Sequence, residues 1–136
     1  MNVAWTVVAR NADAIAACER AEAWAIGAGC AAGVGLKLAL VLEELLTNTI
    51  KYGNGKDSEA TVRLVLEIAD GRLRVTYEDD APAFDPLQQI AATTPGSANV
   101  GGFGLHLIRG LVETMTYARQ SERNVVGLVM AANPLE

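Results

Sequence analysis

The chain has 136 residues, of which 51% are hydrophobic and 20% are charged, a composition typical of one globular domain rather than of a disordered segment. Its 11 basic and 16 acidic residues give a formal net charge of −5, which disfavours a general nucleic-acid binder because phosphate contacts need a basic face. We find neither an apolar run long enough to span a membrane nor a signal-peptide pattern. We therefore expect one cytoplasmic domain over residues 1–136. Cys18 and Cys30 are too few for a disulfide framework and lack the spacing of a zinc site.

The first half of the chain shows a strand followed by two helices. Residues 1–10 alternate between apolar and polar positions, which predicts a strand. The alanine-rich spacing predicts a helix over about 12–28, with Asn11 as its N-cap. Glycines between 27 and 33 are expected to end this helix. The clearest helical pattern covers 36–52, where leucines recur on one face.

The middle of the chain shows a hairpin and then a long irregular segment. Residues 61–69 and 73–77 alternate as strands, and Asp70-Gly71 between them is a strong signal for a tight turn. Residues 81–100 contain three prolines and little periodicity beyond a short helix at 87–92. A loop of this length in so small a domain is usually functional, so we expect a lid over a ligand.

The last third of the chain predicts one helix and one hairpin. Apolar residues over 104–115 recur at helical spacing, and residues 116–120 and 125–131 alternate as paired strands. Runs of strands with helices grouped on one face indicate an α+β two-layer sandwich.

Three clusters could carry chemistry, and the first lies on the predicted helix 36–52. Glu44 and Asn48 are four residues apart and share one face, with Lys51 on the same side. A carboxylate can deprotonate a nucleophile, a carboxamide oxygen suits Mg²⁺, and a lysine can meet a phosphate. Taken alone, these residues also fit a solvated polar face.

The second and third clusters follow in chain order. Asp79 ends a strand, where its carboxylate could accept a hydrogen bond from an amino group such as that of adenine; the alternative is an acidic turn ended by proline. Gly102 and Gly104 lead into a helix, where backbone N–H groups could bind an anion; the alternative is a flexible hinge. The glycines match neither the dinucleotide fingerprint nor a Walker A loop.

The order of the three clusters resembles the N, G1 and G2 boxes of the gyrase/histidine-kinase ATPase superfamily, the Bergerat fold, over about residues 36–119. Phe84-Asp85-Pro86, the stretch 101–109 and Arg123-Asn124 are most similar to the stand-alone anti-sigma-factor serine/threonine kinases. The resemblance implies a mixed, mostly antiparallel sheet with helices on one face.

The resemblance also implies ATP and Mg²⁺ as cofactors and gives each cluster a role. Glu44 would be the catalytic general base, Asn48 the Mg²⁺ ligand, and Asp79 the partner of the adenine amino group. The other residues implied at the nucleotide are Lys51, Ala81, Ala83, Gly102, Gly104 and Leu105.

One departure from the family pattern concerns the G1 box, which usually reads Asp-x-Gly-x-Gly. Ala81 and Ala83 occupy the glycine positions here. Each adds a methyl group and disfavours a positive φ by about 1 kcal/mol where that conformation is required. Ala81 is the more consequential change, and it could weaken nucleotide affinity.

The resemblance implies an ATP-dependent protein serine/threonine kinase that phosphorylates an anti-anti-sigma (STAS-type) antagonist and sequesters a sigma factor, with a homodimer as a further expectation. One alternative is a nucleotide-dependent partner-binding switch without kinase activity, and another is a partner-binding domain that no longer binds ATP. His106 is the only histidine and lies within the third cluster. A self-sufficient sensor kinase is not expected, because no separate domain for a phosphoacceptor histidine fits in this length.

Overall fold

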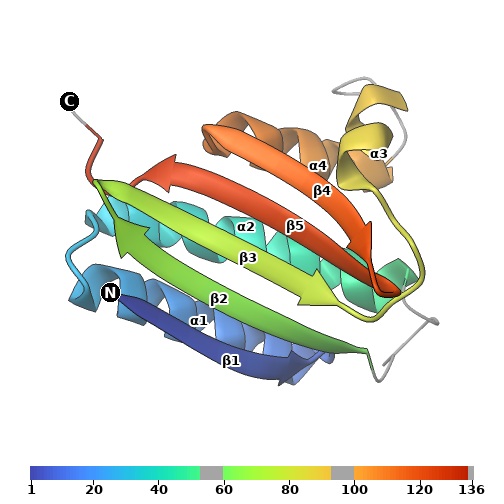
Figure 1. Ribbon diagram of the computed structural model, residues 1–136, viewed down its shortest axis with the longest axis horizontal. Coiled ribbons are helices and arrows are strands. Elements are labelled where there is room, and N and C mark those ends of the chain that lie inside the picture. The colour runs from blue at the N-terminus through green and yellow to red at the C-terminus, as the bar shows by residue number, and fades with distance from the viewer. Residues whose placement is uncertain (53–59, 93–99, 135–136) are drawn as a thin grey trace.

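The computed structural model describes residues 1–52, 60–92 and 100–134 (Figure 1). Its elements, in chain order, are β1 (Asn2–Val8), α1 (Asn11–Gly27), α2 (Ala32–Tyr52), β2 (Thr61–Ala69), β3 (Arg72–Asp79), α3 (Pro86–Ala92), α4 (Val100–Leu111), β4 (Thr114–Gln120) and β5 (Arg123–Ala131).

The strands form one sheet in the order β1-β2-β3-β5-β4, and the long helices cover one of its faces (Figure 1). In the figure, α1 lies behind β1 and β2, and α2 lies behind β3 and β5. The predicted α+β two-layer sandwich is therefore confirmed. The sheet is simpler than the mixed one expected, since every neighbouring pair of the strands described here is antiparallel.

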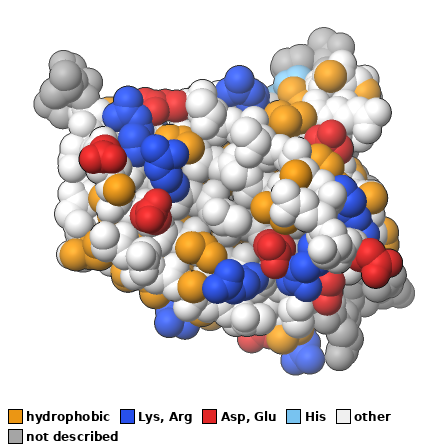
Figure 2. Space-filling model, in the orientation of Figure 1, with side chains coloured by type: hydrophobic (Ala, Val, Ile, Leu, Met, Phe, Trp, Pro, Cys, Tyr) orange, Lys and Arg blue, Asp and Glu red, His pale blue; other side chains and the backbone are white. Residues whose placement is uncertain are grey.

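The core lies between the sheet and the helices and follows the period-two alternation of the strands. Leu64, Val75, Tyr77 and Leu128 face the helices and are almost fully buried. The other face of the sheet is uncovered, and Figure 2 shows it as an uncharged centre with charged side chains toward its two ends.

Two predicted helix boundaries are wrong for reasons that packing explains. α2 begins at Ala32, so the early glycines lie inside it; Gly35 is buried, and a Cβ there would lie 2.9 Å from Cγ1 of Ile26 on α1. The glycine therefore permits close helix packing, and the chain turns instead at Gly29, whose φ is +106°. Asn11 is not the N-cap of α1, because the helix begins at Asn11 and Arg10 occupies the cap position.

The last helix is also displaced from its prediction. α4 starts at Val100 rather than residue 104 and ends at Leu111 rather than residue 115. Met115 lies in β4 and is buried there, so its apolar side chain fitted a helical pattern although it belongs to a strand. The part of the expected lid at residues 93–99 lies outside the described residues.

Cys18 lies in α1, and Cys30 follows the turn at the end of that helix. Cys18 and Cys30 are free, and burial raises the pKa of the half-buried Cys18 thiol to about 11, which keeps it protonated. Within the three described ranges, no helix is long and apolar enough to cross a membrane.

Both hairpins of the sheet use two-residue turns with positive φ. Asp70 and Gly71 have φ values of 53° and 72°, which confirms the predicted turn between β2 and β3. The turn between β4 and β5 uses Ser121 and Glu122, with φ values of 51° and 63°. Neither residue is glycine, so this turn carries a conformational cost of about 1 kcal/mol or more per residue.

Replacing Glu122 with glycine should therefore stabilise the protein. Relief of the left-handed conformation outweighs the greater chain entropy of glycine, and we expect a gain of up to about 1 kcal/mol in the free energy of unfolding. Thermal unfolding should show a rise in Tm of about 4 °C. Gly71→Ala, in the other turn, should lower Tm; a lower Tm for Glu122→Gly would contradict this account.

Candidate functional site

The first predicted cluster lies on the side of α2 that borders α4. Asn48 Nδ2 donates a hydrogen bond to Glu44 Oε2 at 3.2 Å, one helical turn away. Asn48 is only 6% exposed, so it is not part of a solvated polar face, the alternative that the sequence had left open. Lys51, in contrast, is exposed in the last turn of α2.

Glu44 is half-buried, and burial raises the pKa of its carboxyl group above the ordinary value. The neighbouring charge of Glu43 adds to this rise, while the hydrogen bond from Asn48 and the charge of Lys51 oppose it. A raised pKa makes the carboxylate a better proton acceptor, which suits a general base.

The third cluster meets the first at Gly104. A Cβ added to Gly104 would overlap the carboxylate of Glu44, so the carboxylate lies directly against the backbone of α4. Gly102 lies in the first turn of α4, whose leading N–H groups have no partner within the helix. Leu105 is fully buried in the core, so only its backbone could contribute to a nucleotide site.

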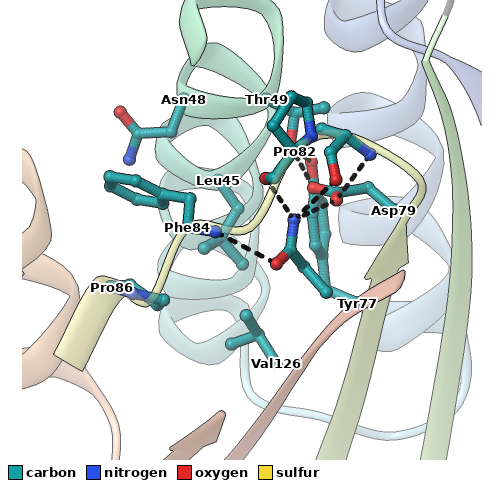
Figure 3. Close-up of a pocket in the computed structure, with 11 residues that line it drawn as sticks. Leu45, Asn48, Thr49, Tyr77, Asp79, Pro82, Phe84, Pro86 and Val126 are labelled. Atoms are coloured by element: carbon teal, nitrogen blue, oxygen red, sulfur yellow. Dashed lines mark hydrogen bonds between the residues drawn. The ribbon is translucent and has the colours of Figure 1, made fainter. Parts of the chain in front are cut away.

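The second cluster is centred on Asp79, which is 5% exposed at the end of β3 (Figure 3). Its Oδ2 accepts a hydrogen bond from Thr49 Oγ1 at 2.8 Å. Its Oδ1 accepts from Asn124 Nδ2 at 2.8 Å and from the backbone N–H of Ala81 at 3.2 Å. All three partners donate, which is the arrangement that an ionised carboxylate requires.

Tyr77 extends this network below Asp79. Its hydroxyl lies 2.7 Å from Thr49 Oγ1. Burial raises the pKa of Tyr77 well above its usual range, so the hydroxyl stays protonated. Since Thr49 uses its one proton on Asp79, Tyr77 must donate to Thr49.

A small cavity of about 30 Å³ connects these groups. Ala81 lines it, whereas Ala83 is exposed and does not. Figure 3 shows the ring of Phe84, which also lines the cavity, beside Asn48 and Leu45. The lining residues are Leu45, Asn48, Thr49, Tyr77, Asp79, Ala81, Pro82, Phe84, Pro86, Asn124 and Val126.

A metal ion would have few protein ligands here. The described residues contain no group of three or more His, Cys, Asp or Glu that could hold one. Asn48 nevertheless fits a Mg²⁺ ligand, because its Nδ2 is engaged by Glu44 while its carbonyl oxygen points away from Phe84 (Figure 3). Such an ion would need phosphate and water oxygens to complete its shell.

Sequence reasoning gave no role in the site to two of its residues. Thr49 follows Leu42, Leu45 and Leu46 at helical spacing, so its hydroxyl belongs to the core-facing arc of α2. Asn124 precedes buried alternate positions of β5 and was noticed only through the family resemblance. In both cases the signal was a polar residue at a position that periodicity assigns to the core.

Replacing Thr49 with valine should destabilise the protein by about 1–3 kcal/mol, because Asp79 Oδ2 and the Tyr77 hydroxyl lose a buried partner. Thr47→Val is the matched control: it lies on the same helix, has the same change in helix propensity, and is exposed. We expect the control to change stability by less than about 0.5 kcal/mol in urea unfolding. Equal losses of unfolding free energy in the two variants would contradict the role of Thr49 in this hydrogen-bond network.

Comparison with solved structures identifies the fold. A chain with the RsbU and RsbW domains from Mycobacterium tuberculosis matches with a TM-score of 0.70, covering 96% of this chain and 32% of that chain at 14% identity. A chain of the SiaB–SiaC complex from Pseudomonas aeruginosa matches with a TM-score of 0.61, covering 94% and 88% at 15% identity. This chain spans about a third of the length of the first match, and identities this low show a shared fold alone.

Comparison with sequences identifies the family. Serine/threonine-protein kinase BtrW of Bordetella bronchiseptica is 26% identical over 100 residues, which cover 71% of this chain and 70% of that protein. The histidine kinase-like ATPase domain family matches residues 7–130, a range that includes all three clusters. The chain therefore belongs to the histidine kinase-like ATPase domain family, within the superfamily that the order of its three clusters indicates.

Proposed function

We propose that the protein is an ATP-dependent protein serine/threonine kinase of the anti-sigma-factor type. The observation that carries the proposal is the carboxylate of Glu44, which Asn48 holds and the backbone of Gly104 covers, beside the cavity that contains Asp79. The family is one of ATPase domains, and the relative from Bordetella bronchiseptica is named a serine/threonine kinase.

The nucleotide would lie between α2 and the segment that follows β3. Asp79 would accept a hydrogen bond from the adenine amino group, and the first turn of α4 would face the phosphates. Asn48 would hold Mg²⁺, which neutralises phosphate charge when it is bound. The base would lie against Ala81, Pro82 and Phe84, which line the cavity beside Asp79.

Phosphoryl transfer would then follow the geometry of Glu44. The serine hydroxyl of an acceptor gives its proton to the Glu44 carboxylate while its oxygen forms a bond to the γ-phosphorus. The bond between the γ-phosphorus and the β–γ bridging oxygen breaks, and ADP leaves. Positioning and charge supply most of the rate in such reactions, with a general base typically adding about 10²–10⁴-fold.

The proposed acceptor is an antagonist protein of the anti-anti-sigma (STAS) type, and the proposed regulated partner is a sigma factor. A homodimer is part of the same proposal, and all three rest on the family resemblance. The alternative is a nucleotide-dependent switch without kinase activity. Ala81 instead favours the other alternative, a partner-binding domain that no longer binds ATP, because it lies 4% exposed in the cavity wall where the family usually has glycine.

Glu44→Gln tests the kinase proposal. The variant keeps the size of the side chain and an acceptor oxygen for Asn48, so ATP binding should be nearly unchanged. Transfer of labelled γ-phosphate to serine of STAS-type proteins from the source organism should fall by about 10²–10⁴-fold in single-turnover assays. Glu43→Gln is the matched control, because Glu43 is exposed and points about 100° around the helix.

The stability of the same variant gives an independent check. Because the pKa of Glu44 is raised, the folded chain binds more protons than the unfolded chain between the ordinary and the raised values. The contribution of this group to stability is therefore lost as pH rises through that window. Glutamine does not titrate, so the free energy of unfolding of Glu44→Gln should increase relative to that of wild type as pH increases.

The phosphotransfer assay has two outcomes that contradict the kinase proposal. If Glu44→Gln transfers phosphate at the wild-type rate, Glu44 is not the general base. If wild type binds ATP but transfers no phosphate, the alternative of a nucleotide-dependent switch is correct.

Gly104→Ala, on α4, should displace the carboxylate of Glu44. The added methyl group overlaps the Glu44 carboxylate, which must rotate away from Asn48, and phosphotransfer should fall by about 10²-fold. The flexible glutamate side chain can move, so the variant should still fold. Gly110→Ala is the control on the same helix: nothing lies within 4 Å of its added Cβ, and it should gain about 0.5–1 kcal/mol of stability with unchanged transfer. Equal transfer rates in the two variants would contradict the contact.

A further inference from the structure

Asn124 makes more hydrogen bonds than any role in sheet pairing requires. It is 4% exposed at the start of β5, directly opposite Asp79 in the register of β3 and β5. Its Nδ2 donates to Asp79 Oδ1 at 2.8 Å and to the carbonyl oxygens of Pro82 and Ala81 at 3.0 and 3.3 Å. The side chain thus holds both the carboxylate and the segment that follows it.

The other end of the Asn124 amide is also engaged. Its Oδ1 accepts from the backbone N–H of Phe84 at 3.1 Å and from the Tyr117 hydroxyl at 2.6 Å. Arg119 Nη1 donates to Ala81 O at 2.8 Å from the neighbouring strand β4. The β4–β5 hairpin therefore holds the segment from Ala81 to Phe84, which follows the last paired residue of β3.

Only an amide can satisfy this set of partners at this position. A leucine of similar shape has neither donor nor acceptor, and an aspartate cannot donate to Asp79 when it is ionised. The amide orientation is determined by its surroundings, because Nδ2 meets three acceptors and Oδ1 meets two donors.

The donors around Asp79 determine what a ligand must offer. Asn124 and the N–H of Ala81 donate to Oδ1, and Thr49 donates to Oδ2. The carboxylate therefore remains an acceptor on both oxygens. A purine with an amino group at position 6 supplies the missing donor, whereas a 6-oxo purine presents an acceptor and is repelled.

We infer that Asn124 is a positioning residue that keeps Asp79 an acceptor and seats residues 81–84 against the base, and that it thereby sets the preference for 6-amino over 6-oxo purine nucleotides. This inference rests on the proposed binding of a nucleotide at Asp79. It assigns selectivity to the β4–β5 hairpin as well as to Asp79 itself.

Asn124→Asp is the decisive variant. It places a second carboxyl group 2.8 Å from Asp79, where two carboxylates share a proton, so one of them becomes a donor. In titration calorimetry with Mg-ATP and Mg-GTP, we expect ATP affinity to fall by about 10- to 100-fold. The ATP:GTP affinity ratio should fall with it, a change that general loosening of the fold would not produce.

Two further variants make the result interpretable. Asn133→Asp adds the same charge at an exposed asparagine that donates to Gly29 O at 3.2 Å, and it should keep both the affinity and the ratio. Tyr117→Phe removes one donor to Asn124 Oδ1 and leaves the bond to Asp79 intact, so ATP affinity should fall by only about two- to fivefold. This milder variant tests the hairpin even if Asn124→Asp fails to fold.

The outcomes separate this inference from the function on which it rests. If wild type binds neither nucleotide, the proposed function fails. If wild type binds ATP and Asn124→Asp keeps the wild-type affinity and ratio, the inference is overturned while the proposed function stands. If Tyr117→Phe and Asn133→Asp have the same effect on ATP affinity, the hairpin does not position the site.

Discussion

The site depends on one constraint: a carboxylate buried in the protein must receive hydrogen bonds on both oxygens. Asp79 receives them from three separate parts of the chain, namely Thr49 on α2, Asn124 on β5 and the backbone of Ala81. None of these donors is correctly placed unless α2 packs on the sheet and β3 pairs with β5 in the observed register. Burial of Asp79 is therefore favourable only when α2 and β5 both lie in their observed positions beside β3.

α2 contributes residues both to the core and to the candidate site, because its helical spacing places them on two adjoining arcs of the helix. Leu45 and Leu46 fill the core, and Thr49 continues that arc as far as Asp79. Glu44 and Asn48 lie on the adjoining arc, where Gly104 of α4, which has no side chain, lies against the Glu44 carboxylate. The desolvation that raises the pKa of Glu44 is thus a consequence of packing between the two helices.

Much of this arrangement follows from local sequence. Alternation predicts β2 and β3, Asp70-Gly71 predicts their turn, and leucine spacing predicts the body of α2. The spacing of Glu44 and Asn48 predicts their contact, because four residues make about one helical turn. The order of three short motifs predicts the family. Each of these features is encoded within a few neighbouring residues, so no knowledge of the packing is needed to find it.

The sequence by itself therefore determined the fold class, the family and the three clusters, whereas the tertiary structure decided how the clusters are completed. Gly35 lies where α1 and α2 approach each other closely, and no local pattern predicts this contact, because close approach is a property of two helices and not of one. The pairing of Asp79 with Asn124 joins residues 45 apart, and the cover of Gly104 over Glu44 joins two helices. Such partners are set by the register of the sheet and the packing of its helices, which no local pattern in the chain specifies.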